Sequence, residues 1–235
     1  VAVRRPDLAG HLQPLGAVGQ IMPVQANLRY RWSVDRAVEG ADAVVNLVGI
    51  LNESGRQNFS VLHNFGARAV AEATRAAGIQ TLVHQSALGA DPKSDSLYAR
   101  TKALGEAAVL ETVPDAVILR PSIVFGPEDQ FFNRFGDLAR ISPFLPLIGG
   151  GKTQLQPVFV GDVAEAIARG VEGQLSGGTI YELGGPEVKT FRQCLELLLT
   201  EIERSPLLVS VPWSVAHYGA VLTQLLPNPL LTTDQ

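Results

Sequence analysis

The chain has 235 residues, with 23 acidic and 19 basic side chains and a formal net charge of −4 at pH 7. Hydrophobic residues make up 46% and charged residues 18%, which excludes disorder as the main state. The charge balance argues against a nucleic-acid partner, because neutralising phosphates requires a basic face. A single cysteine, Cys194, and four dispersed histidines predict neither a disulfide nor a metal site. We therefore expect a globular protein of a reducing compartment, cytoplasmic or similar to the mitochondrial matrix.

Short β-branched runs alternate with longer helical patterns, which is typical of βαβ units and a parallel sheet. Most of these runs lack polar alternation, as expected of strands that helices cover on both faces. The predicted strands are residues 1–3, 20–24, 43–48, 81–85 and 116–119. The predicted helices span about 57–77, 97–111, 162–171 and 190–203. The pattern therefore predicts an α/β, Rossmann-type fold with a doubly wound parallel sheet.

Two helices carry further signals. In the helix at 57–77, Phe65, Ala69, Ala73 and Ala76 lie on one stripe, which predicts its core face, and Gly78 is a suitable stop. Thr190 is the predicted N-cap of the last helix.

Prolines and glycines interrupt the chain from 120 to 157 and predict a small lobe of loops and short helices at the end of the sheet. We assign residues 1–125 to a dinucleotide-binding domain, to which 157–185 partly returns. Residues 126–156 and 186–235 form the predicted smaller lobe for substrate or interactions.

Tyr98 and Lys102 lie four residues apart at the start of a predicted helix, and therefore on one face of it. A tyrosine with an ordinary pKa near 10 exchanges protons poorly at pH 7, whereas a neighbouring ammonium group favours the phenolate. This predicts a lowered pKa and an acid/base role for Tyr98. The spacing alone is also typical of a half-buried tyrosine beside a solvated lysine. Ser86 ends the preceding predicted strand, at the sheet edge where such a site would lie.

These residues carry a family resemblance. Tyr98-x-x-x-Lys102, Asn64 in the preceding helix and Arg-Pro-Ser-Ile-Val-Phe-Gly-Pro at 120–127 resemble the extended and atypical short-chain dehydrogenase/reductases, the NAD-dependent epimerase/dehydratase group. Val-Asn-Leu-Val-Gly-Ile-Leu-Asn at 45–52 and Ser-Ala-Leu-Gly-Ala-Asp at 86–91 are similar to one branch of this group. That branch contains the NADPH-binding accessory subunit of respiratory complex I and its bacterial relatives. The resemblance implies Tyr98, Lys102 and Ser86 as the catalytic set, with Ala87 as the alternative position for the family hydroxyl.

The glycine-rich turn that cradles the cofactor pyrophosphate in this family is absent from the chain. Because this turn should precede Val1, we expect the first βα unit to be missing from the chain.

The resemblance also implies a nicotinamide dinucleotide and its contacts. Arg4 and Arg5 fall where the second strand of the fold ends, and arginine there accommodates a 2′-phosphate. We therefore predict a preference for NADP(H), with NAD(H) as the second choice; a solvated surface pair of arginines is the alternative. The other predicted cofactor-binding residues are Asn27, Leu28, Leu47, Val48, Gly49, Tyr98, Lys102, Pro121, Ser122 and Ile123.

Three functions remain open at this point. The first is an oxidoreductase or epimerase acting on a small or apolar carbonyl or hydroxyl compound. The second, which the complex I resemblance implies, is a non-catalytic, NADPH-bound accessory subunit of a respiratory NADH:quinone oxidoreductase. The third is a sensor of the NADPH/NADP⁺ ratio. The apolar side chains of the lobe form either a substrate pocket or its core: Phe131, Phe132, Phe135, Phe144 and Leu145.

Three polar residues have open roles. Asn64 makes either a structural hydrogen bond or a catalytic contact. His63 and His84 are predicted to pack or to face solvent rather than to act as bases.

Residues 205–233 contain no charged side chain. Prolines limit any helix there to about 213–226, roughly 21 Å, which is shorter than a bilayer core of ~30 Å. Closing the lobe is the simpler role for this tail. Docking on a respiratory complex, or peripherally on the inner membrane, is the alternative.

Overall fold

The computed structural model describes residues 1–55 and 57–212. The chain divides into two compact units. The first unit comprises Val1–Leu119 and Ile167–Tyr181, and the second comprises Arg120–Ala166 and Glu182–Gln235. The chain passes from one unit to the other within three elements: β5 (Val117–Pro121), α5 (Val160–Val171) and β10 (Ile180–Leu183).

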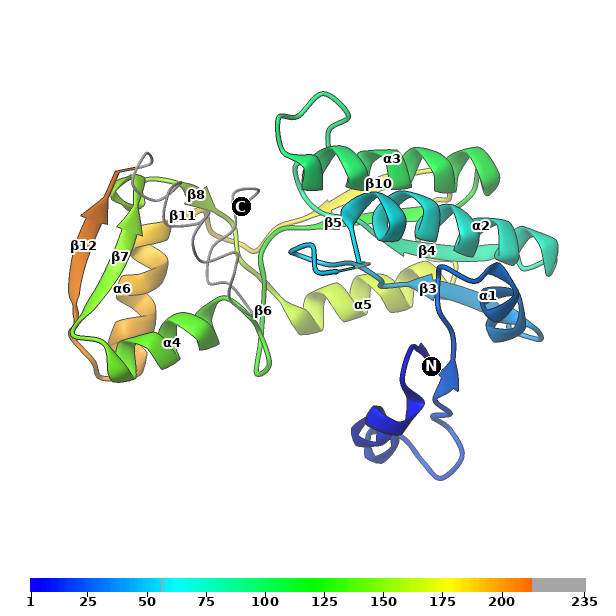
Figure 1. Ribbon diagram of the computed structural model, residues 1–235, viewed down its shortest axis with the longest axis horizontal. Coiled ribbons are helices and arrows are strands. Elements are labelled where there is room, and N and C mark those ends of the chain that lie inside the picture. The colour runs from blue at the N-terminus through cyan, green and yellow to red at the C-terminus, as the bar shows by residue number, and fades with distance from the viewer. Residues whose placement is uncertain (56, 213–235) are drawn as a thin grey trace. The chain divides into compact units, whose positions relative to one another are not determined.

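A four-stranded sheet with the order β10-β5-β4-β3 forms the centre of the first unit (Figure 1). β3 (Ala43–Asn46) pairs in parallel with β4 (Thr81–Gln85), and β4 pairs in parallel with β5. Asn46 lies beside His84 in this register, so the carboxyl ends of β3 and β4 meet at one edge. This edge is where ligands bind in open parallel sheets.

Helices cover β4 on both faces. Leu82 joins a core cluster with buried residues of α1 (Arg31–Val38), α2 (Gly66–Ala76) and α3 (Leu97–Thr112). Val83 faces the opposite side, where a Cβ added to Gly170 of α5 would lie 2.9 Å from its Cγ2 atom. Figure 1 shows α2 and α3 on one side of the sheet and α5 on the other. The predicted doubly wound fold is confirmed, and burial on both faces explains the missing polar alternation.

The N-terminal strands are shorter than predicted. β1 (Ala2–Val3) and β2 (Val24–Gln25) form a separate parallel pair, with two 3₁₀ helices between them, Pro6–Leu8 and Gly10–Leu15. The strand predicted at 20–24 begins only at Val24, because Gly19 has a φ of +79° and Gln20 accepts a hydrogen bond from the Ala17 N–H (2.8 Å) in a turn.

β3 ends two residues earlier than predicted. The side chain of Asn46 turns back to accept a hydrogen bond from the Val48 N–H (3.1 Å), which ends the extended backbone.

The helix predicted at 57–77 begins with a π-helical segment, Ser60–Phe65, and continues as α2. Its predicted end is confirmed: Gly78 has a φ of +73°, and the Ile79 N–H donates to the Thr74 carbonyl at 3.1 Å. The predicted apolar stripe is correct at Ala73, which is buried, but wrong at Phe65, which is 62% exposed. The buried face carries small residues: Gly66, Ala67, Val70, Ala71, Ala73 and Thr74. Small residues lie there because the helices meet closely: a Cβ on Gly105 of α3 would overlap the His63 carbonyl oxygen.

The second unit is more regular than the predicted lobe of loops and short helices, because it also contains strand pairs. It contains the helices α4 (Phe132–Ile141) and α6 (Phe191–Glu201), the latter capped as predicted by Thr190, whose hydroxyl accepts from the Gln193 N–H at 3.2 Å. Its strand pairs are β6 (Val124–Phe125) with β9 (Val158–Phe159), β8 (Gln154–Leu155) with β11 (Lys189–Thr190), and β7 (Phe144–Ile148) with β12 (Leu207–Val211). β7 tolerates Pro146 because, among the described residues, it pairs on one side only.

Three of the five apolar residues of the predicted pocket lie in the core of the second unit. Leu145 is fully buried, and Phe131 and Phe135 contact the Phe191 ring, with centroids 6.0 and 5.4 Å from it. Phe132 packs against Phe131, whereas Phe144 is 57% exposed. The lobe-core alternative is therefore favoured for Phe131, Phe135 and Leu145.

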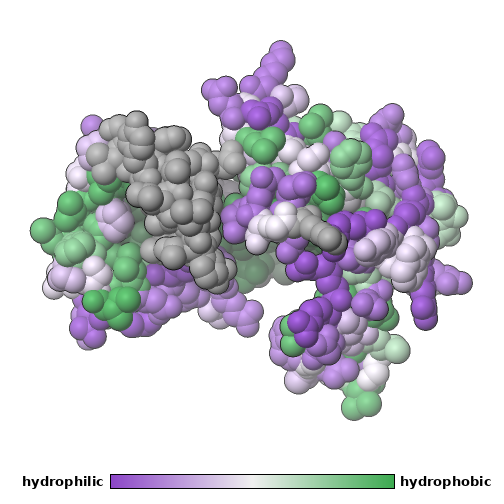
Figure 2. All heavy atoms as spheres, in the orientation of Figure 1, coloured by the Kyte–Doolittle hydropathy of each residue, from purple (hydrophilic) through white to green (hydrophobic). Residues whose placement is uncertain are grey.

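Exposed apolar side chains gather on the β7–β12 pair, at the left end of Figure 2. The predicted tail helix at 213–226 lies outside the described residues. Within residues 1–55 and 57–212, no helix combines the length and hydropathy that crossing a bilayer requires.

Candidate functional site

A cavity of about 200 Å³ opens at the carboxyl ends of β3 and β4 in the first unit. It brings the three predicted catalytic residues together with two residues of the predicted 47–49 segment. Its lining consists of Leu47, Gly49, Ile50, Leu51, Gln85, Ser86, Tyr98 and Lys102. α3 starts at its N-cap Ser96, whose hydroxyl accepts from the Ala99 N–H at 3.3 Å, so Tyr98 and Lys102 fall in its first two turns.

The Ser86 hydroxyl is buried without a hydrogen-bond partner among the described residues. Its backbone N–H, in contrast, donates to the Leu119 carbonyl at 2.7 Å. An unpartnered buried hydroxyl costs about 1–3 kcal/mol. A polar ligand in the cavity would remove this cost, so Ser86 Oγ is available for binding.

Lys102 is only 6% exposed, and burial lowers its pKa to about 8, against the opposing effect of the Glu106 carboxylate. Its ammonium group donates to the Gln85 carbonyl at 3.4 Å. The same group lies against Gly49, where a Cβ would be 3.2 Å from Nζ. Lys102 is therefore a largely protonated donor held at the end of β3.

The structure contradicts the expected lowering of the Tyr98 pKa. Burial raises this pKa, so the phenol is protonated at pH 7 and acts as a hydrogen-bond donor. The Tyr98 ring lies edge-on to Phe59 and His63, with centroids 5.7 and 5.3 Å away. Packing against these rings contributes to the burial of Tyr98, and burial is the cause of the raised pKa.

The predicted histidine packing holds, but sequence reasoning missed what His63 contacts. His63 is 2% exposed, and its Nε2 atom accepts a hydrogen bond from the Ile50 N–H at 3.2 Å. His84 lies in β4 with its Nδ1 atom 3.0 Å from Asn46 Nδ2. Burial, followed by the Lys102 charge, lowers the pKa of His63 to about 4 and that of His84 to about 3. Asn64 is not among the residues that line the cavity.

A second cavity, of about 510 Å³, lies beside β1, β2 and α1 in the same unit. Its lining consists of Arg4, Val24, Gln25, Asn27, Tyr30, Trp32, Ser33, Arg36 and Ala37. The predicted cofactor residues Arg4 and Asn27 therefore share one cavity. Arg36 was not predicted, because the sequence patterns did not reveal α1.

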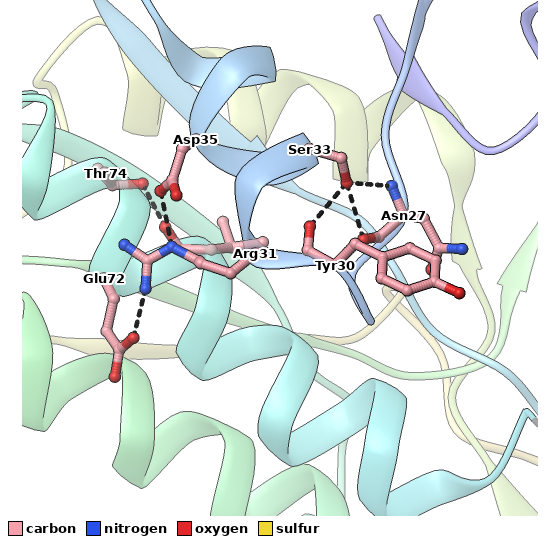
Figure 3. Close-up of polar contacts among 8 residues, drawn as sticks. Asn27, Tyr30, Arg31, Ser33, Asp35, Glu72 and Thr74 are labelled. Atoms are coloured by element: carbon pink, nitrogen blue, oxygen red, sulfur yellow. Dashed lines mark hydrogen bonds and ion pairs between the residues drawn. The ribbon is translucent and has the colours of Figure 1, made fainter.

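Hydrogen bonds fix the wall of this second cavity (Figure 3). Ser33 Oγ accepts from the Asn27 N–H at 3.0 Å and lies 2.8 Å from the Tyr30 carbonyl oxygen. Arg31 points away from it into ion pairs with Asp35 and Glu72, at 2.6 and 2.5 Å. Arg4 and Arg36, in contrast, make no ion pair within the described part of the chain, which leaves their charges available to an anion.

Several predicted cofactor residues lie elsewhere. Arg5 pairs with Asp7 at 2.9 Å on the surface, and Leu28 packs against Gly66. Val48 belongs to the segment at the first cavity but does not line it. Pro121, Ser122 and Ile123 belong to the second unit, where the Ser122 N–H donates to the Leu183 carbonyl at 2.8 Å. No group of described side chains could hold a metal ion.

The parallel sheet, the Tyr98–Lys102 pair and Ser86 at one strand edge, and the basic cavity at the end of β1 are the features of a dinucleotide-binding protein with an open parallel sheet. The chain belongs to the family described as NAD(P)H-binding, which matches residues 1–128.

The chain is similar to named subunits of respiratory NADH dehydrogenase. It is 36% identical to the mitochondrial NADH dehydrogenase [ubiquinone] 1 alpha subcomplex subunit 9 of Arabidopsis thaliana, over 94% of this chain and 56% of that protein. The mouse protein of the same name is also 36% identical, over 96% of this chain and 60% of that protein. The NADH-ubiquinone oxidoreductase 40 kDa subunit of Neurospora crassa is 28% identical, over 96% and 59%. The chain thus spans little more than half the length of these relatives.

Solved structures share the fold. The dTDP-glucose 4,6-dehydratase of Streptomyces venezuelae, solved with NAD, has a TM-score of 0.72 at 23% identity and covers 86% of this chain and 70% of its own. The dTDP-4-dehydrorhamnose reductase of Bacillus anthracis, in complex with NADP, has a TM-score of 0.69 at 17% identity. The match covers 88% of this chain and 82% of the reductase chain.

Proposed function

We propose that this chain holds NADP(H) as a tightly bound, non-reacting cofactor in an accessory subunit of a respiratory NADH:quinone oxidoreductase. The similarity to the Arabidopsis, mouse and Neurospora subunits, along 94–96% of the chain, carries this proposal. A place on the complex, peripheral to the inner membrane, is part of it.

The residues of the first cavity fit a nicotinamide dinucleotide. The Lys102 ammonium suits ribose hydroxyls beside Gly49, where the absent side chain permits close approach. Ser86 Oγ and the protonated Tyr98 phenol supply two further polar contacts. The chemistry that a nicotinamide ring offers is hydride transfer. In the accessory role these side chains only bind and orient the ring.

We further propose that Arg4 and Arg36 bind the 2′-phosphate and so confer a preference for NADP(H). Both line the second cavity without an ion pair among the described residues, whereas Arg5 is engaged by Asp7. Charge-assisted hydrogen bonds to a phosphate contribute about 1.5–3 kcal/mol each.

An active oxidoreductase is the second candidate function. Its support is the unpartnered Ser86 hydroxyl in one cavity with Tyr98 and Lys102. A relative named ceramide reductase, from Caulobacter vibrioides, is 36% identical over 49% of this chain and 36% of that protein. Such an enzyme would use Tyr98 to give a proton to the oxygen of an apolar carbonyl compound.

Two experiments test and separate these functions. In the first, the full-length protein carries an affinity tag in its own cells, and membranes are extracted in mild detergent. We expect NADH:quinone oxidoreductase activity to co-purify with the tagged protein. A tagged protein recovered without that activity would contradict the accessory role. With Tyr98→Phe, the accessory role predicts unchanged assembly and retained nucleotide. If the chain is instead an active oxidoreductase, Tyr98→Phe should lower substrate turnover by a factor on the order of 10²–10⁴.

A further inference from the structure

The buried imidazole of His63 connects the backbone after β3 to α3 through hydrogen bonds to Ile50 and Thr101. We propose that His63 is a positioning residue that sets the distance between the Gly49–Ile50 backbone and the Tyr98–Lys102 helix face, and thereby the shape of the nicotinamide end of the site. This inference rests on the proposed binding of NADP(H). It concerns a residue that lines neither of the two cavities.

The hydrogen bonds around His63 form a continuous chain. The Thr101 hydroxyl donates to the Tyr98 carbonyl at 3.0 Å, so its oxygen is left to accept. His63 Nδ1, 3.1 Å from that oxygen, is therefore the protonated nitrogen. The other nitrogen, Nε2, accepts from the Ile50 N–H at 3.2 Å. One neutral tautomer satisfies all three bonds, and the pKa of about 4 keeps the ring neutral at pH 7.

Aromatic rings and backbone hold the imidazole in place. Phe59 stacks on it with centroids 5.3 Å apart at 24°, and Tyr98 meets it edge-on at 5.3 Å and 89°. Nε2 would lie 3.9 Å from a Cβ on Gly49. His63 therefore lies directly behind the segment that faces Lys102, buried and in contact with two aromatic rings.

The supported segment has few other anchors. Leu47 and Leu51 are 56% and 52% exposed, so burial of their side chains does not fix this backbone. The Ile50 N–H bond to His63 and the Val48 N–H bond to Asn46 are its side-chain hydrogen bonds among the described residues. Loss of the first would free the part of the segment that carries Gly49, and with it the contact surface of Lys102.

The test compares two ligands on the purified full-length protein. In the proposed binding mode, NADPH occupies both cavities, whereas adenosine 2′,5′-bisphosphate occupies only the cavity that Arg4 lines. For His63→Leu we expect NADPH to bind about tenfold more weakly, the equivalent of one net hydrogen bond with its desolvation cost, and the bisphosphate to bind as before. For His63→Gln, whose amide oxygen can accept from Ile50, we expect part of the NADPH affinity to return.

Thr101 provides a matched pair that leaves the ring in place. Thr101→Val removes the acceptor of Nδ1–H, whereas Thr101→Ser keeps it. We expect only the valine variant to lose NADPH affinity and to shift the His63 tautomer, read from long-range ¹H–¹⁵N spectra of the imidazole.

Three outcomes would overturn the inference: equal NADPH affinity in His63→Leu, equal losses for both ligands, or a wild-type imidazole protonated at Nε2. Failure of the wild-type protein to bind NADPH would instead contradict the proposed function. The spectra would still show which nitrogen of His63 carries the proton, and so test the hydrogen bonds to Thr101 and Ile50.

Discussion

Lys102 is the residue through which the site responds to pH. Its pKa of about 8 lies below the ordinary 10.5 because burial disfavours the ammonium form. The ammonium donates charge-assisted hydrogen bonds, and the neutral amine does not. Nucleotide affinity should therefore change little between pH 7 and about 7.5 and fall as the pH rises through 8, by at most tenfold per pH unit.

Calorimetric titration with NADPH between pH 7 and 9.5 measures this dependence. His63 and His84 titrate near 4 and 3, and the Tyr98 pKa is raised above its ordinary value of 10.0, so none of them changes charge in this window. Lys102→Gln should bind weakly and without pH dependence. A wild-type affinity that does not change up to pH 9.5 would refute the assignment.

The cofactor preference depends on two arginines in the second cavity. Arg4→Ala and Arg36→Ala should each weaken NADPH binding about tenfold or more while leaving NADH binding unchanged, because only NADPH carries the 2′-phosphate. Arg5→Ala is the matched control, and its exposed ion pair with Asp7 predicts little effect. A loss in Arg5→Ala equal to that in Arg36→Ala would reject this distribution of roles.

The residues of the site were predictable to different degrees. Tyr98, Lys102 and Ser86 follow from a helix start and a strand end, which are local features of the sequence. Arg36 and the contacts of His63 are not local: the first requires that α1 be recognised beside β1, and the second depends on which backbone meets a buried ring. The direction of the Tyr98 pKa shift also depends on burial, which the spacing from Lys102 does not reveal.

At the scale of elements, the close approach of α3 to the π-helical segment determines how the helix face that carries Tyr98 and Lys102 is held. Gly105 lies against the His63 carbonyl oxygen with no room for a Cβ. Gly105→Ala should therefore lower the free energy of unfolding by about 1–3 kcal/mol, as overpacked helix contacts do. Urea unfolding measures the loss.

Gly136 in α4 is the control for Gly105. A Cβ there would meet Leu198 Cδ1 at 3.7 Å, an ordinary contact, so Gly136→Ala should raise the free energy of unfolding by about 0.5–1 kcal/mol through helix propensity. Equal effects of the two substitutions would show that α3 does not pack as described.

Element prediction succeeded where periodicity and end signals agreed. β4 matches its predicted bounds, and the Gly78 and Thr190 end signals are confirmed. It failed where tertiary contacts override local patterns. Pro146 lies in β7 because, within residues 1–55 and 57–212, that strand has a partner on one side only. Phe65 is exposed because a small-residue face packs more closely.

At the scale of the whole molecule, β12 belongs to the fold of the second unit. β12 pairs with all five residues of β7, and Leu208 packs on the cores around Leu145 and Leu147. A chain that ends at Arg204 loses this strand and should be poorly folded, with a broad, non-cooperative thermal transition. A sharp transition at the temperature of the intact protein would contradict this expectation.

The central claim is that this chain carries NADP(H) as a resident cofactor. Its most direct test is to purify the full-length protein under native conditions, denature it and quantify the released nucleotides by mass spectrometry. The account predicts about one NADP(H) per chain, retained through gel filtration, with little NAD(H). Purified protein that contains NAD(H) in excess of NADP(H), or that contains no nucleotide and fails to bind added NADPH, would contradict it.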